Sequence, residues 1–398
     1  MIVLKVLFFL VTGYFTFCSL YIFLYSIAGL FYKNPVFRKA TAYKKIAILV
    51  PAYKTNEVIE ELVNNVLLQD YKNYDLIVIT DSLRDDVLIR LKQKPIKVMP
   101  FHDENRSKAL ALNTVMSQLS EDYDIALILD ADNLIQDKDY LCRLNDIFNS
   151  GVQAVQTHRT AKNTNTALAM LDATSEEINN HIFRRGHVVL GLSSALIGSA
   201  MAFGYKLYRE QMNSITASGE DKEMEIRLLK NRIPIVYVDD MIVLDEKVQK
   251  ANSFVNQRAR WIANQMMQAK NNIGEAFKEL FRGNIDFFDK AVQHFLMPRL
   301  FLMVAVFVCS GLAMLFLSGA YLYEWIAIAI ITYFSILISI PGRMYTIRLL
   351  KSVIYLPIGV ILMIMSLFRI KGATKKFVAT EHTTIPSKQK INQKVKPI

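Results

Sequence analysis

The sequence predicts an α/β domain with a mostly parallel sheet, flanked by transmembrane and interfacial helices. Two long apolar segments near the ends of the 398-residue chain indicate membrane helices. Between them, short apolar runs alternate with helical patterns, which is typical of a parallel sheet covered on both faces. Hydrophobic residues make up 52% of the chain and charged residues 21%, so only part of it suits a bilayer.

The first membrane helix is predicted at residues 1–32. This run is apolar except for Lys5, and it exceeds the roughly 20 residues that cross a bilayer. It shows no small-residue cleavage site, so we expect a retained helix rather than a signal peptide. We expect residues 33–282 to form a cytoplasmic domain, because the next charges are all basic; they are Lys33, Arg38, Lys39, Lys44 and Lys45.

Residues 283–370 are predicted to form interfacial and transmembrane helices. Spans are expected at Leu300–Leu317 and Tyr323–Ile340, and an amphipathic helix on the membrane surface at Asn284–Gln293. The apolar segment Val353–Phe368 is short for a span. A third span would place the basic tail outside, against the positive-inside rule, so we favour a re-entrant or interfacial helix here.

Residues 371–398 are expected to be a basic cytoplasmic tail. The net charge of +11 is concentrated there and beside the apolar segments. Anionic membrane lipids are therefore the expected partner, and nucleic acid is not. The cysteines show neither a disulfide framework nor metal-site spacing, which fits a reducing cytoplasm; they are Cys18, Cys142 and Cys309. The predicted location is the cell (inner) membrane, crossed several times.

The central domain carries the pattern of a nucleotide-binding sheet. Apolar runs with turn residues after them predict strands, and apolar residues at helical spacing predict helices. The strands are expected at Ile46–Val50, Leu76–Thr80, Ile96–Met99 and Ile125–Leu129, and the helices at Asn56–Gln69 and Ser107–Leu119. In parallel sheets of this kind, ligands bind beyond the carboxyl ends of the strands.

Acidic residues stand at two of those strand ends. Asp81 ends the second strand, and the fourth runs into Asp130-Ala131-Asp132. Alternate residues of an extended chain project to the same side, so Asp130 and Asp132 can face one cation. Mg²⁺ or Mn²⁺ uses one or two carboxylates together with phosphate oxygens. The alternative is a pair of solvated acids in a turn.

Five stretches of sequence together resemble the processive family-2 glycosyltransferases, which include the synthases of hyaluronan, cellulose, chitin and poly-N-acetylglucosamine. The resemblance covers roughly Ile46 to Trp261 and implies a GT-A fold, whose mostly parallel sheet binds a nucleotide sugar. The stretches are VPAYKTNEVIEELV, VITDS, SKALALN, DAD, and GEDKEMEIRLL followed by QRARW.

The resemblance assigns the donor side of the site. It implies that Tyr53 packs on uracil and that Asp81 binds the uracil ring or the ribose. It places Lys108 near the diphosphate, and it makes Asp130 and Asp132 the metal ligands, with Asp130 also near the substrate. The alternatives are ordinary loop packing for Tyr53, a helix cap for Asp81 and a solvated lysine at position 108.

The resemblance also assigns the acceptor side. It makes Asp221 the general base, with Glu220 beside it at the substrate; Gly219 stands where threonine is common. On a predicted helix, Gln257 and Trp261 share one face.

A tryptophan face can support a sugar ring, and arginine can bind phosphate. We therefore expect Trp261 under the acceptor sugar, and Arg258 and Arg260 at the departing diphosphate. The alternative is an interfacial tryptophan with snorkelling arginines.

The predicted function is transfer of sugar, with inversion, from a nucleotide-sugar donor, expected to be a UDP-sugar, to a growing polysaccharide, coupled to export. One alternative is a non-processive transferase that adds a single sugar to a lipid-linked acceptor. The other is a non-enzymatic accessory membrane protein with a degenerate nucleotide fold. A homodimer or an accessory export partner stays open, because the predicted spans are few for a secretion channel.

Overall fold

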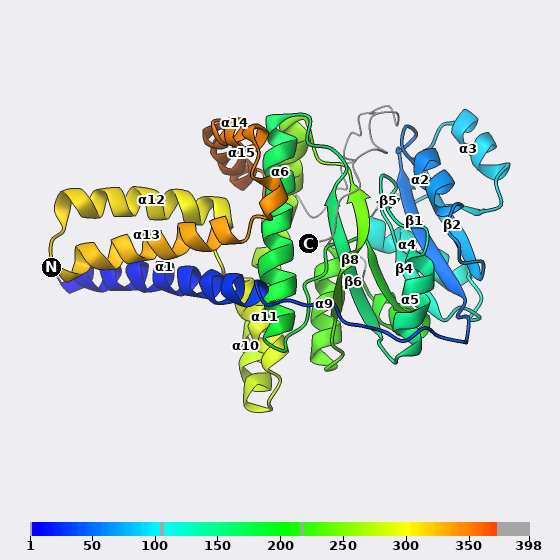
Figure 1. Cartoon of the computed structure of the whole chain (residues 1–398), viewed down its shortest axis with the longest axis horizontal. Coiled ribbons are helices and arrows are strands. Elements are labelled where there is room, and N and C mark those ends of the chain that lie inside the picture. The colour runs from blue at the N-terminus through cyan, green and yellow to red at the C-terminus, as the bar shows by residue number, and fades with distance from the viewer. Residues whose placement is uncertain (1, 104–106, 216–218, 372–398) are drawn as a thin grey trace.

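The strands of the central domain form one sheet, as the computed structural model shows for the residues that it describes: 2–103, 107–215 and 219–371 (Figure 1). The sheet order is β3-β2-β1-β4-β7-β6-β8-β5. Four neighbouring pairs are parallel, namely β1–β2, β1–β4, β2–β3 and β6–β8, and the other three are antiparallel. The predicted fold class, an α/β domain with a mostly parallel sheet, is therefore confirmed.

The strands lie close to the predicted positions in the first half of the domain. One difference is that the first strand continues through Pro51, which pairs with Ile79, as far as Tyr53. The strands are β1 Ile46–Tyr53, β2 Tyr74–Asp81, β3 Lys97–Pro100, β4 Ile125–Ile128, β5 Leu134–Ile135, β6 Ala154–Ala161, β7 Met201–Gly204 and β8 Val236–Asp245.

Helices cover both faces of the sheet, which explains why β1, β2 and β4 are largely apolar. Along β1, Ile48 packs on the side of α2 and α5, and Leu49 packs on the side of α4, α8 and α9. The helix predicted at 56–69 begins later, at Ile59. These helices are α2 Ile59–Val66, α3 Asp85–Lys92, α4 Lys108–Gln118, α5 Tyr140–Asn149, α8 Tyr205–Met212 and α9 Glu220–Lys230.

A second layer of helices lies between the sheet and the long apolar helices (Figure 1). It begins with α6 Ala167–Asn180, which continues through the π-helix η1 His181–Gly186 into α7 His187–Val189. It is completed by α10 Ala251–Phe281 and α11 Ile285–Gln293. The helix predicted on the membrane surface at 284–293 is present, but its Phe287 is buried in the core of the domain, so protein covers part of its apolar face.

Among the described residues, three helices are long and apolar enough to cross a membrane: α1 Ile2–Gly29, α12 Arg299–Phe316 and α13 Ala320–Ile338. They lie side by side and extend away from the sheet (Figure 1). A short 3₁₀ turn, η2 Gly342–Met344, leads to the pair α14 Ile347–Val353 and α15 Leu356–Phe368. This pair is bent by 54°, so it is either one broken span or a re-entrant loop. All of the predicted basic tail except residue 371 lies outside the described residues.

Candidate active site

One large cavity opens at the carboxyl ends of β1, β2 and β4. Its volume is about 1270 Å³, and it extends from these strand ends past α6, α9 and α10 to the apolar helices. Every site residue predicted from the sequence lines it, although the segments that supply them are far apart in the chain. These residues are Tyr53, Asp81, Lys108, Asp130, Asp132, Glu220, Asp221, Gln257, Arg258, Arg260 and Trp261.

Two residues at the tips of neighbouring strands line the end of the cavity at the sheet. Tyr53 and Asp81 are direct partners in the parallel pairing of β1 with β2. Asp81 is buried, and its Oδ1 accepts a hydrogen bond of 2.8 Å from the hydroxyl of Ser82. This position leaves the Tyr53 ring and the Asp81 carboxyl on one rim, which suits a flat base with ring nitrogens.

Lys108, the first residue of α4, lies among acids. Its Nζ is 2.5 Å from Asp130 Oδ1 and 3.4 Å from Glu220 Oε1, and it donates to the Gly198 carbonyl oxygen at 2.6 Å. A lysine at a helix N-terminus is unfavourable alone, and these acids offset that cost. Burial acts to lower the pKa of Lys108, but Asp130 and Glu220 outweigh it and raise the pKa.

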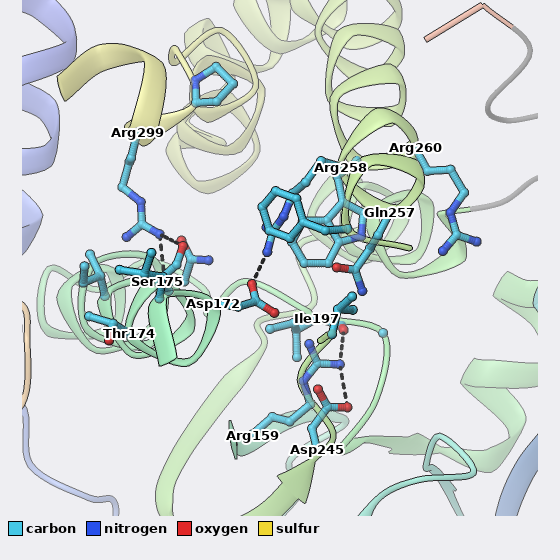
Figure 2. A pocket seen from close by; sticks show the side chains of 18 of the residues that line it. Arg159, Asp172, Thr174, Ser175, Ile197, Asp245, Gln257, Arg258, Arg260 and Arg299 are labelled. Carbon is cyan, nitrogen blue, oxygen red and sulfur yellow. Dashed lines mark hydrogen bonds and ion pairs between the residues drawn. The ribbon is translucent and has the colours of Figure 1, made fainter. Parts of the chain in front are cut away.

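Asp130 lies between two cations. Besides Lys108, the guanidinium of Arg159 approaches Asp130 Oδ2, with Nη1 at 3.9 Å. Burial acts to raise the pKa of Asp130, yet Lys108 and Arg159 hold it below its ordinary value, so the carboxylate is ionised at neutral pH. The same Arg159 Nη1 lies 3.7 Å from Asp245 Oδ1 (Figure 2).

A third carboxylate, that of Asp245, joins the two that the sequence predicts. The side chain of Asn133 donates to Asp245 Oδ1 at 3.1 Å and lies 3.4 Å from Asp132 Oδ1. Burial raises the pKa of Asp245 and the charges of Asp132 and Asp130 add to this, although Arg159 opposes it. Lys247 Nζ, 2.7 Å from Asp245 Oδ2, offsets part of the negative charge at the rim of the cavity, and a hard cation with oxygen ligands would offset more of it. Within the described residues, no three acidic, histidine or cysteine side chains are already placed around one metal position.

Glu220 and Asp221 begin α9 at the acceptor side. Burial raises the pKa of Glu220 and the Asp221 charge adds to this, although Lys108 opposes it. Gly219, just before them, has φ +95°, and a Cβ there would lie 2.3 Å from Nδ2 of Asn264. A threonine therefore does not fit this backbone, which explains why the sequence departs from the family pattern.

The QRARW segment places four side chains on the first half of α10. Arg258 forms an ion pair with Asp172 of α6 (Figure 2), and its guanidinium carbon is 4.1 Å from the Trp261 ring centre. Oε1 of Gln257 is buried without a hydrogen-bond partner in the described part of the chain. Trp261 is 42% exposed, so its ring remains accessible from the cavity. Burial lowers the pKa of Arg260.

Sequence reasoning missed several charged residues of the cavity. Asp245 ends β8 just as Asp81 ends β2, so an acid after an apolar strand was a usable signal. Arg159 lies inside a strand, and nothing local marks it. Arg184 and Arg299 lie in an irregular helix and at the start of an apolar helix, where only the tertiary structure brings them to the cavity.

A comparison with protein families decides the class of the chain. The family described as "Glycosyltransferase like family 2" matches residues 44–264, which is more than half of the chain. The chain belongs to this family of glycosyltransferases. The resemblance found in its motifs is therefore confirmed at the level of the family.

Relatives of this glycosyltransferase share part of its length. A poly-beta-1,6-N-acetyl-D-glucosamine synthase of Staphylococcus aureus (strain COL) is 27% identical over 157 residues, which is 38% of this chain and 38% of the relative. An uncharacterized glycosyltransferase of Rickettsia conorii is 29% identical over 129 residues, or 29% of this chain and 21% of the relative. The chain thus matches well under half the length of these relatives.

A solved structure confirms the fold of the glycosyltransferase. A mannosyltransferase from Pyrobaculum calidifontis, in complex with GDP-Man and Mn²⁺, superposes with a TM-score of 0.51 and 16% identity. The match covers 81% of this chain and 95% of that one. Together with the family match, it confirms the predicted GT-A-like fold.

Proposed function

We propose that this protein is an inverting membrane glycosyltransferase that moves a sugar from a nucleotide-sugar donor, with a UDP-sugar expected, to a growing polysaccharide. One observation carries the proposal. The motif residues, from Tyr53 to Trp261, line a single cavity that runs from the carboxyl ends of the strands to the apolar helices. This arrangement allows a donor to bind at the sheet while an acceptor enters from the membrane side.

The acidic rim suits a divalent cation. Asp130 and Asp132 would hold Mg²⁺ or Mn²⁺, with the remaining ligands supplied by the donor diphosphate; the related mannosyltransferase structure contains Mn²⁺. Such an ion neutralises the charge that develops on the leaving diphosphate. Three carboxylates, those of Asp130, Asp132 and Asp245, line this part of the cavity, and the raised pKa of Asp245 supports the binding of further positive charge there.

Residues of the chain accept the proton of the acceptor hydroxyl and orient the two substrates. Asp221 accepts the proton of the acceptor hydroxyl, and that oxygen forms a bond to the anomeric carbon of the donor sugar. The bond between this carbon and the diphosphate oxygen breaks on the opposite face, so the configuration inverts. Lys108 and Arg260 face the departing diphosphate, and Trp261 stacks against the acceptor sugar.

The acceptor has two candidates. A polysaccharide end is supported by the relative that is named a polysaccharide synthase. A lipid-linked acceptor, extended by a single sugar, is supported by the apolar wall of the cavity beside α13 and α14, which includes Ile336, Ile340 and Leu349. In both cases we propose that the domain lies in the cytoplasm, at the cell (inner) membrane. A homodimer or an export partner is compatible with the site.

The test uses membranes that contain the full chain, a panel of radiolabelled nucleotide sugars, and Asp221→Asn. Loss of a general base lowers turnover by about 10²–10⁴-fold, while donor binding should persist. Glu223→Gln is the matched control, because Glu223 lies on the same helix, pairs with Arg227 and does not line the cavity.

Three outcomes separate the alternatives. Normal product from Asp221→Asn would contradict the base assignment. Product length on a gel distinguishes a polymer from a single transfer. No transfer or hydrolysis of any donor by the unmodified protein would favour the non-enzymatic accessory reading.

A further inference from the structure

Arg299 is a partly buried cation without an acidic partner in the described chain. It begins α12, where the catalytic domain meets the apolar helices, and it lines the cavity. Its Nη2 donates to the carbonyl and hydroxyl oxygens of Ser175 at 2.7 and 3.0 Å (Figure 2). Its Nη1 is buried and has no hydrogen-bond partner among the described residues. The charged groups that act on it are Arg258 and Arg184, both of its own sign.

Arg184 adds a second cation to the same part of the cavity. It is 3% exposed and donates to neutral acceptors, the Ala195 carbonyl at 3.1 Å and the Asn180 side chain at 2.6 Å. Burial lowers its pKa to about 10, so it remains charged at neutral pH. Arg258, in contrast, is neutralised by Asp172. A buried charge costs several kcal/mol unless an opposite charge offsets it. Glu225 and Glu177 offset part of this cost for Arg184, whereas both charges that act on Arg299 are positive, so this part of the cavity favours an anion.

The N-terminus of α12 favours the same kind of ligand. This helix has 18 residues, and Pro298, its N-cap, supplies no side-chain hydrogen bond. Pro298, Arg299 and Leu300 all line the cavity. The positive end of the helix dipole therefore lies at the cavity wall beside Arg299, an arrangement that suits phosphate oxygens.

Beyond the arginines the cavity becomes apolar. Its wall there is formed by side chains of α12, α13, α14, α15 and the turn after α13, among them Met303, Ile336, Ile340, Leu349, Val353 and Met363. The helices that supply this wall form two groups: α12 packs on α13, whereas α14 packs on α6 and α15 on α10 (Figure 1). A sugar polymer would find few hydrogen-bond partners between them, but a hydrocarbon chain would bury apolar surface.

We propose that this part of the cavity binds a lipid with a phosphate headgroup. The phosphate contacts Arg299 and Arg184 at the N-terminus of α12, and the hydrocarbon chain lies between the α12–α13 pair and the α14–α15 pair. One part of this inference rests on the proposed function, namely that the lipid carries the acceptor to Asp221. Lipid binding itself requires no donor and no transfer.

The test measures lipid binding by the full chain in phosphatidylcholine nanodiscs without a donor. The probe is fluorescent phosphatidic acid, and the competitors are unlabelled phosphatidic acid, diacylglycerol with the same chains, and inorganic phosphate. Arg299→Gln should weaken binding about tenfold or more, as expected for loss of a charged hydrogen bond, and Arg299→Lys should restore most of it. Arg348→Gln is the control, because Arg348 is an exposed arginine at the start of α14 that does not line this cavity.

Each result decides one point. Competition by phosphatidic acid alone supports the proposal. Equal competition by inorganic phosphate would show a site for free phosphate and overturn the lipid assignment, and equal competition by diacylglycerol would show that the arginines are not used. Wild-type affinity in Arg299→Gln would also overturn it. Donor hydrolysis by the same samples, measured without added lipid, tests the proposed function separately.

Discussion

A buried ion cluster fixes α9, the helix that begins with Glu220 and Asp221, to α11, and removing one lysine from it should destabilise the protein strongly. Nζ of Lys290 on α11 lies 2.8 Å from Glu225 Oε1 on α9, and the two side chains are 1% and 0% exposed. Lys222 Nζ lies 2.9 Å from the other oxygen of Glu225 and is 31% exposed. In Lys290→Met, Glu225 keeps only this more solvated partner.

The size of the effect follows from the pKa of Glu225. Burial acts to raise this pKa, but Lys222 and Lys290 outweigh it and lower it from 4.5 to about 2. A difference of this size corresponds to roughly 3 kcal/mol of stability, which Lys222 and Lys290 share. Breaking a buried ion pair from one side adds the cost of a poorly compensated buried charge, about 3–5 kcal/mol in all. We therefore expect Lys290→Met to lose about 3 kcal/mol. Because the folded pKa is depressed, the loss is full above pH 4.5 and shrinks as the pH falls toward 2.

The assay is thermal unfolding of the detergent-solubilised full chain, followed by circular dichroism. A loss of this size lowers the midpoint by roughly 6–12 °C for a domain of such length. Glu225→Gln added to Lys290→Met should recover much of the loss, since the buried charge is then gone. Lys270→Met, at an exposed position on α10, should change little. A double variant no more stable than Lys290→Met would refute the reasoning.

Three further predictions concern other close contacts. Gly219→Thr should lower turnover more than stability, because the backbone has φ +95° and the Cβ would meet Asn264 at 2.3 Å beside Asp221; unchanged kcat would contradict this. Gly186→Ala should lower the free energy of unfolding by roughly 1–3 kcal/mol or more, because its Cβ would lie 2.2 Å from the Tyr25 carbonyl oxygen of α1; a wild-type melting curve would contradict it. Burial acts to lower the pKa of His158, but Glu177 and Asp239 outweigh it and raise the pKa from 6.5 to about 9. The charged imidazole therefore contributes roughly 3 kcal/mol of stability below pH 6.5, and this contribution is lost as the pH rises through 9. The melting temperature of the unmodified protein should fall over that interval, and His158→Gln should make the fall shallower. An equally steep fall in the variant would contradict the assignment.

The local pattern of the sequence was sufficient for the first half of the sheet and for most of the candidate site. Strands buried on both faces are apolar throughout, so the runs at β1, β2 and β4 could be recognised without structural information. Asp81, Asp130 and Asp132 stand at strand ends, where the chain must leave the sheet and ligands bind. Helical spacing likewise brought Gln257 and Trp261 to one face.

The second half of the sheet was not predicted. The sequence of β6 includes buried polar residues such as His158 and Arg159. Because of these residues, the segment lacks the apolar run that predicts a buried strand. These side chains are tolerated because partners lie on distant elements: Glu177 on α6 lies 3.2 Å from His158, and Glu176 on the same helix accepts a hydrogen bond of 2.8 Å from Arg159. The spacing of apolar and polar residues along the sequence gives no indication of such pairings.

Burial and strand-end position leave local signatures, so the acidic strand ends and the apolar helices on both sides of the domain could be predicted from the residues alone. That Arg184 and Arg299 line the same cavity as Asp130 and Asp221 became evident only from the folded chain. An arginine in an irregular or apolar helix carries no local sign of its neighbours. Whether a carboxylate or a ligand offsets its charge depends on which segments meet beside it when the chain folds.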